Sequence, residues 1–96
     1  MIKPPHPGKT IREDYLVPLG MSVNRLAGVL GVSSARLNEI VTGKCGITAD
    51  TALRLARCFG TSAEFWLNLQ SLYNLRMAER KARARIEREV KPLKVA

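Results

Sequence analysis

Three hydrogen-bonding side chains, Ser34, Asn38 and Thr42, recur at intervals of four residues. Residues at this spacing share one face of a helix. An Asn amide can pair with adenine through two hydrogen bonds, and Ser and Thr hydroxyls can also bond base edges. Such a row is typical of a helix that reads DNA in the major groove. The alternative is a helix face that only meets solvent.

Basic and polar residues flank this row. We expect the cations among them to contact phosphate oxygens rather than bases, although many surface cations are merely solvated. Arg36 and Lys44 lie beside the row, and Asn24 and Arg25 lie in the preceding helix. The residues predicted to contact DNA are Asn24, Arg25, Ser33, Ser34, Arg36, Asn38, Glu39, Thr42 and Lys44.

Residues 22–42 have the pattern of two short helices joined by a tight turn. Gly31 stands between them and can take the left-handed conformation that ends a helix. Ser22 and Ser33 stand where N-caps are expected. The apolar residues that face inward are Leu26, Ala27, Leu30, Val32, Leu37 and Ile40. This pattern predicts a helix-turn-helix, with a purely structural helix pair as the alternative.

Two further helices are predicted on either side of this unit. The first covers residues 7–17, faces Ile11, Tyr15 and Leu16 inward, and is ended by Pro18 and Gly20. The other covers residues 49–59 and begins after the cap Thr48. Its predicted buried stripe is Ala49, Ala52, Leu53, Ala56 and Phe59.

A fifth helix opens with the capping-box pattern of residues 61–64, and no clear breaker follows before Pro92. Its broad apolar side suits a homodimer, and two copies would read a palindromic operator with half-sites one DNA turn apart. The residues predicted to form the dimer interface are Trp66, Leu69, Leu72, Tyr73 and Met77. For Trp66, as for Phe65, a place in the core is the more ordinary interpretation.

The composition supports one small all-α domain with a polyanionic partner. The chain has 96 residues, a net charge of +8 and 46% apolar residues. Residues 1–75, predicted to form the DNA-binding domain, carry eight Lys/Arg against five Asp/Glu; residues 76–96 carry eight against three. This C-terminal segment is predicted to be a basic helix or tail. It could be a solvated helix, a non-specific DNA arm or an RNA-binding segment.

No pattern favours catalysis, a metal or a cofactor. The single histidine, His6, stands in a Pro-rich end, and the adjacent Glu13 and Asp14 diverge on a helix. Cys45 and Cys58 match no zinc spacing, and we interpret them as free thiols in a reducing cytoplasm, with a disulfide as the alternative. Neither a signal segment nor a membrane span is expected.

Three stretches of the chain resemble one known family: PPHPG, LNEIVTGKCGITADTALRLARCFGTSAEFWLNLQ and YNLRMAER. The family is that of the HigA-type antitoxins, in the Xre-like group of helix-turn-helix proteins. The chain is also similar to proteins labelled virulence-associated protein I. The resemblance covers roughly residues 4–80.

The resemblance implies a five-helix, lambda-repressor-like fold, a homodimer, repression of the protein's own operon and a partner toxin resembling the RelE-like mRNA interferases. It maps the recognition helix onto residues 34–41. Val23 and Ser34 stand where phage repressors often have Gln, so their base contacts are not transferred. If a toxin binds, we expect it on the N-terminal face with Glu13 and Asp14. The alternatives are a stand-alone regulator, a helical protein-interaction module and an RNA-binding protein.

Overall fold

The computed structural model describes residues 5–94, which form five continuous helices and no strand. The first helix has three parts, the α-helical α1 (Pro7–Thr10), the π-helical η1 (Ile11–Leu16) and α2 (Val17–Leu19). It is followed by α3 (Val23–Leu30), α4 (Ser34–Val41), α5 (Ala49–Phe59) and α6 (Ala63–Glu89). The prediction of an all-α, five-helix fold is confirmed.

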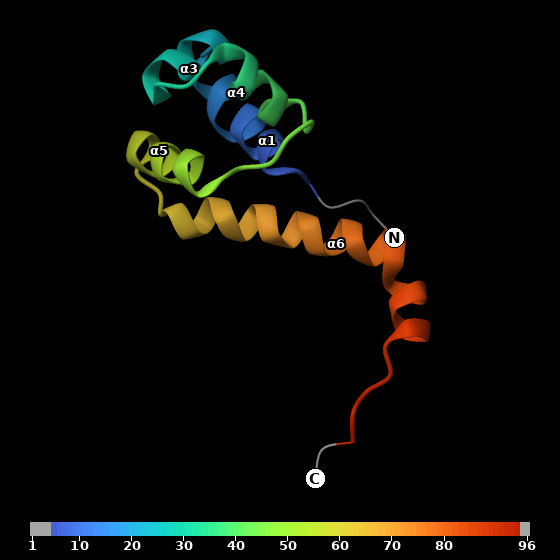
Figure 1. Ribbon diagram of the computed structural model, residues 1–96. Helices are drawn as coiled ribbons and strands as arrows, with labels where there is room; N and C mark the ends of the chain where they lie inside the picture. The colour runs from blue at the N-terminus through green and yellow to red at the C-terminus, as the bar shows by residue number, and fades with distance from the viewer. Residues whose placement is uncertain (1–4, 95–96) are drawn as a thin grey trace.

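The four shorter helices and the first part of the long helix α6 form a compact group, from which the rest of α6 extends (Figure 1). α3 packs on α4 and α5, and α4 packs on α1. α6 packs against α5 and α1, and its C-terminal turns extend away from the other helices (Figure 1). The helix-turn-helix therefore sits on a platform made by α1, α5 and the first half of α6.

The first helix continues through Pro18, where the sequence predicted its end. Just before the proline the backbone widens into a π turn, in which the Val17 N–H donates to the Arg12 carbonyl five residues earlier. The α-helical hydrogen-bond pattern is therefore already interrupted at this point. Pro18, which has no N–H to donate, can follow without ending the helix. Gly20, in the left-handed conformation at φ 62°, ends the helix.

The core lies where the five helices meet, and Trp66 is its largest fully buried side chain. Its indole ring lies 5.6 Å from the ring of Tyr15, which stacks on Phe59 at 4.1 Å. The indole N–H donates to Thr61 Oγ1 at 2.7 Å, so burial leaves it with a partner. The predicted inward residues that are fully or almost fully buried are Ile11, Leu16, Leu26, Ala27, Leu30, Leu37, Ile40 and Ala52.

The buried stripe of α5 differs from the prediction. Ala49 is exposed and Leu53 is 64% exposed, whereas Thr51 and Leu55 are buried beside Ala52. The buried stripe thus begins at a threonine, which a search for apolar residues overlooks. Thr51 tolerates burial because its hydroxyl oxygen accepts a hydrogen bond from Thr48 Oγ1 at 3.2 Å.

The cap of α6 lies one residue later than the capping-box pattern indicated. Ser62 Oγ accepts from the Phe65 N–H at 3.0 Å, so Ser62 rather than Thr61 is the N-cap. Thr61 instead receives the indole hydrogen bond of Trp66. The prediction that the helix continues into the basic segment is confirmed, because α6 crosses residue 76 without a break.

Candidate nucleic-acid interface

The turn between α3 and α4 has the geometry that the sequence predicted. Gly31 takes the left-handed conformation at φ 73°, and the Val32 N–H donates back to the Ala27 carbonyl at 3.0 Å. Ser33 then starts α4, because its Oγ accepts from the Arg36 N–H at 3.1 Å. Glycine is needed at residue 31 because other residues rarely adopt this positive φ.

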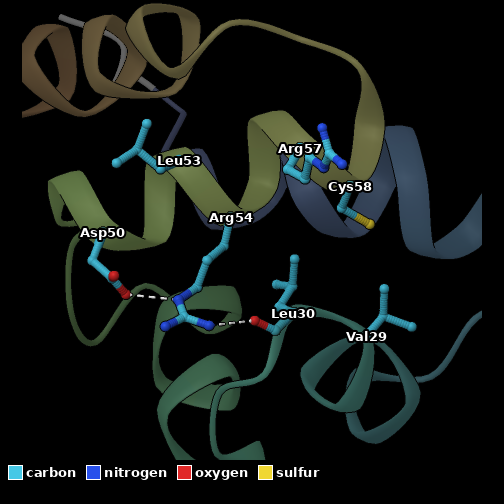
Figure 2. A pocket seen from close by; sticks show the side chains of 7 residues that line it. All are labelled: Val29, Leu30, Asp50, Leu53, Arg54, Arg57 and Cys58. Atoms are coloured by element: carbon cyan, nitrogen blue, oxygen red, sulfur yellow. Dashed lines mark hydrogen bonds and ion pairs between the residues drawn. The ribbon is translucent and has the colours of Figure 1, made fainter.

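An arginine from α5 fixes the end of α3 (Figure 2). Arg54 Nη1 donates to the Leu30 carbonyl at 2.8 Å, and Arg54 Nε pairs with Asp50 at 2.8 Å. A positive charge at the C-terminus of a helix complements its dipole. This contact joins residues 24 apart in sequence, so the sequence does not predict it. The sequence does favour the Asp50–Arg54 ion pair, because residues four apart are neighbours on a helix.

The three side chains of the predicted reading row lie on the exposed side of α4. Ser34, Asn38 and Thr42 are exposed, whereas Leu37 and Ile40 on the other side are fully buried. The Thr42 hydroxyl donates to the Asn38 carbonyl at 2.8 Å, which leaves its oxygen able to accept. The amide of Asn38 makes no hydrogen bond in the described part of the chain and is open to a ligand.

The predicted phosphate contacts fall into two places. Arg36 and Lys44 line the same hollow of about 560 Å³, so the fold brings the loop that follows α4 beside Arg36 in the first turn of that helix. Asn24 and Arg25 lie in the first turn of α3, where the Arg25 N–H donates to the cap Ser22. All nine residues predicted to contact DNA are exposed, and their contacts to DNA stay a prediction.

A buried glutamine on α6 holds the loop that carries Lys44. Gln70 Oε1 accepts from the Ile47 N–H at 2.8 Å, and Gln70 Nε2 donates to Asn74 Oδ1 at 3.0 Å. The backbone passes so close that a Cβ on Gly46 would lie 3.0 Å from the Gln70 amide carbon. Gln70 was not among the residues predicted from the sequence, although a polar residue on the apolar side of a helix is a usable signal.

The residues predicted for a dimer interface lie on different sides of α6. Trp66 is fully buried in its own chain and presents no surface to a partner, so its assignment to the interface is corrected. Leu69, Tyr73 and Met77 are half-buried, and Leu72 is 48% exposed. At 3.6 residues per turn, Tyr73 and Met77 continue the side of Trp66, whereas Leu72 points elsewhere.

Other classes of site are not found in the described residues. Residues 5–94 contain no group of three or more His, Cys, Asp or Glu side chains that could hold a metal ion. In the same residues, no helix combines the length and apolar character needed to cross a membrane. Cys58 lines the hollow between α3 and α5 (Figure 2), and burial raises the pKa of its thiol.

Comparisons with known proteins agree with this architecture. A helix-turn-helix family model matches residues 11–66. Virulence-associated protein I from Dichelobacter nodosus is 58% identical over 74 residues, which span 77% of this chain and 68% of that protein.

Solved structures match nearly the whole chain. An addiction module antidote protein of the HigA family from Coxiella burnetii has 47% identity and a TM-score of 0.91, over 96% of this chain and 100% of that one. The antitoxin HigA from Pseudomonas aeruginosa, described with the higBA promoter, has 45% identity and a TM-score of 0.92, over 95% of this chain and 99% of that one. The chain belongs to the helix-turn-helix family, in the Xre-like group that includes the HigA-type antitoxins.

Proposed function

We propose that this protein is a DNA-binding repressor that acts as the antitoxin of a toxin–antitoxin pair, and not an enzyme. The observation that carries the proposal is the exposed row Ser34, Asn38 and Thr42 on α4, held on a rigid helix-turn-helix. A similar antitoxin, HigA from Pseudomonas aeruginosa, is described with promoter DNA, which supports the same role here. The DNA is double-stranded, and α4 enters its major groove.

The test of DNA binding uses the duplex that precedes the protein's own reading frame, with a shuffled duplex as control. Asn38→Ala should weaken operator binding by about 1–3 kcal/mol and relax the preference at one base pair. Lys44→Ala should weaken binding to both duplexes alike and make the salt dependence shallower by about one unit. Identical effects of the two substitutions on both duplexes would contradict these assignments.

We further propose a homodimer formed through the outward side of α6. Leu72, Leu75, Ala82 and Ile86 follow one another at intervals of three, seven and four residues, which keeps them on one side of a helix. Leu72, Leu75 and Ile86 are 48%, 53% and 47% exposed. An apolar groove of about 280 Å³ lies along this side and includes Leu75 and Ile86. A second copy of α6 is the occupant that fits, because one DNA-reading unit contacts too few base pairs for specificity.

The dimer test replaces Leu72 and Leu75 with Asp. The variant should be a helical monomer with weak, non-cooperative operator binding, as measured by light scattering, circular dichroism and DNA titration. Ala84→Asp adds a carboxylate on the opposite side of the same helix and should remain a dimer. A folded dimer in the first variant would contradict the proposed interface.

The proposed toxin is a ribonuclease resembling the RelE-like mRNA interferases, and the proposed location is the cytoplasm. Glu13 and Asp14 are exposed on the first helix and offer a carboxylate pair to a basic partner. The product of the neighbouring reading frame should arrest growth alone and be neutralised by co-expression of this protein. Glu13→Gln with Asp14→Asn, which adds no cation beside Arg12, should weaken that complex far more than operator binding. A neighbour without toxicity would favour a stand-alone regulator.

A further inference from the structure

We propose that a basic hollow beside the end of α4 holds a phosphate of the DNA backbone, which adds Lys9 and Arg12 of the first helix to the predicted DNA contacts. The hollow has a volume of about 320 Å³ and lies between the first helix, the end of α4 and α6. This inference rests on the proposed DNA binding and extends its footprint to a helix that had no assigned role in it.

Two positively charged side chains line the hollow, and no carboxylate of the described residues lies among them. Lys9 and Arg12 line it from one side of the first helix, three residues apart. Within residues 5–94 neither Lys9 nor Arg12 takes part in an ion pair. These two cations repel each other, and an anion bound beside both would offset that repulsion, so the lining suits an anionic ligand.

The other walls offer hydrogen-bond donors and a close approach. Tyr73 reaches the hollow from α6, and its hydroxyl is a donor. Thr42 and Gly43 form the wall that belongs to the end of α4. The ring of His6 stands edge-on to Tyr73 at 4.8 Å and accepts the Gly8 N–H at 2.9 Å, which ties the start of the first helix to α6.

The position of the hollow favours DNA over an acidic protein partner. The end of the predicted recognition helix forms one of its walls. The hollow also shares His6, Gly43 and Tyr73 with the larger one that Arg36 and Lys44 line. Both hollows are therefore cationic and adjoin the same end of the reading row, where the backbone of a bound strand would pass. Lys, Arg and Tyr are side chains that commonly contact DNA phosphates.

The test compares two double variants that remove the same charge. Lys9→Ala with Arg12→Ala empties the hollow of its cations. Arg57→Ala with Lys81→Ala removes two exposed cations from α5 and α6 that line neither this hollow nor its neighbour. Thermal melts confirm that both variants fold. Operator and shuffled duplexes are then titrated with each protein from 50 to 200 mM salt.

Loss of one phosphate contact should make the slope of log affinity against log salt shallower by about 0.9. The hollow variant's deficit relative to wild type should therefore be about 3.5-fold larger at 50 mM than at 200 mM salt, equally for both duplexes. The control variant should keep the wild-type slope. An unchanged slope in the hollow variant would overturn the proposal.

Inorganic phosphate provides a probe that does not depend on the operator. Titrated into the wild-type protein, it should shift the amide resonances of Gly43 and Tyr73 in nuclear magnetic resonance spectra, and these shifts should vanish in the hollow variant. Phosphate shifts together with an unchanged salt slope would assign the hollow to an acidic protein partner and overturn the DNA assignment. If the wild-type protein bound no duplex, the proposed function itself would fail, whatever phosphate does.

Discussion

Gly8→Ala is the substitution whose effect the structure specifies most sharply. Gly8 is buried where the first helix crosses the end of α4. A Cβ on Gly8 would lie 2.0 Å from the carbonyl oxygen of Ile40 and 2.9 Å from the Cα of Val41. Both atoms belong to the backbone, so no side-chain rotation can relieve the contact.

The magnitude follows from the separation required. A carbon atom approaches a carbonyl oxygen to about 3.3 Å, so the two helices would have to move apart by about 1.3 Å. Overpacking of this kind costs about 1–3 kcal/mol, whereas Ala gains at most about 1 kcal/mol over Gly in a helix. We expect a net loss of unfolding free energy, accompanied by weaker operator binding because α4 is displaced.

Gly28→Ala is the matched control, because it is the same substitution at a helical glycine whose added Cβ would meet open space. No atom of the described part of the chain lies within 4 Å of a Cβ at Gly28, so this variant should be more stable than wild type by about 0.5–1 kcal/mol. The gain of alanine over glycine is common to both variants, so urea melts should separate them by the overpacking cost alone, about 1–3 kcal/mol. Equal stability of the two would refute the close approach of the first helix to α4.

Four other substitutions or measurements test the same architecture. Leu37→Ala should lower the free energy of unfolding by about 2–5 kcal/mol in urea melts, because this side chain is fully buried. Gly31→Val should unfold at lower urea, because valine disfavours φ 73° and its Cβ would lie 3.0 Å from Arg54 Nη1. Gln70→Leu keeps the volume but leaves the buried Ile47 N–H without its acceptor, a loss of about 1–3 kcal/mol. Burial raises the pKa of the Cys58 thiol, so its alkylation at pH 8 should be slower in the folded protein than in urea, where more thiolate is present.

Features set by neighbouring residues were predictable from the sequence. The caps Ser22, Ser33 and Thr48 each accept from the N–H three residues ahead, as predicted. Gly31 and Gly60 end their helices in the left-handed conformation, as glycine allows. These contacts span only a few residues, so residue type and spacing are sufficient to predict them.

Features set by distant contacts were not predictable in the same way. The rotation of α5, which buries Thr51 and exposes Leu53, depends on how this helix packs between α3 and α6. The contact of Arg54 with Leu30 and that of Gln70 with Ile47 join residues more than 20 apart. The spacing of apolar residues along the chain carries no information about such distant partners. It therefore predicts where the helices lie in the sequence better than it predicts which side of each helix is buried.

α6 shows how this difference bears on function. Its apolar residues occupy two sides, although their sequence pattern had been interpreted as one broad surface. Folding of the monomer uses the side of Trp66, which leaves Leu72, Leu75 and Ile86 exposed on a helix that extends beyond the other four. Only the apolar residues on the outward side of α6 are therefore available for burial in a dimer interface. For this reason the dimer experiment changes Leu72 and Leu75, because a substitution at Trp66 would unfold the monomer and leave assembly undecided.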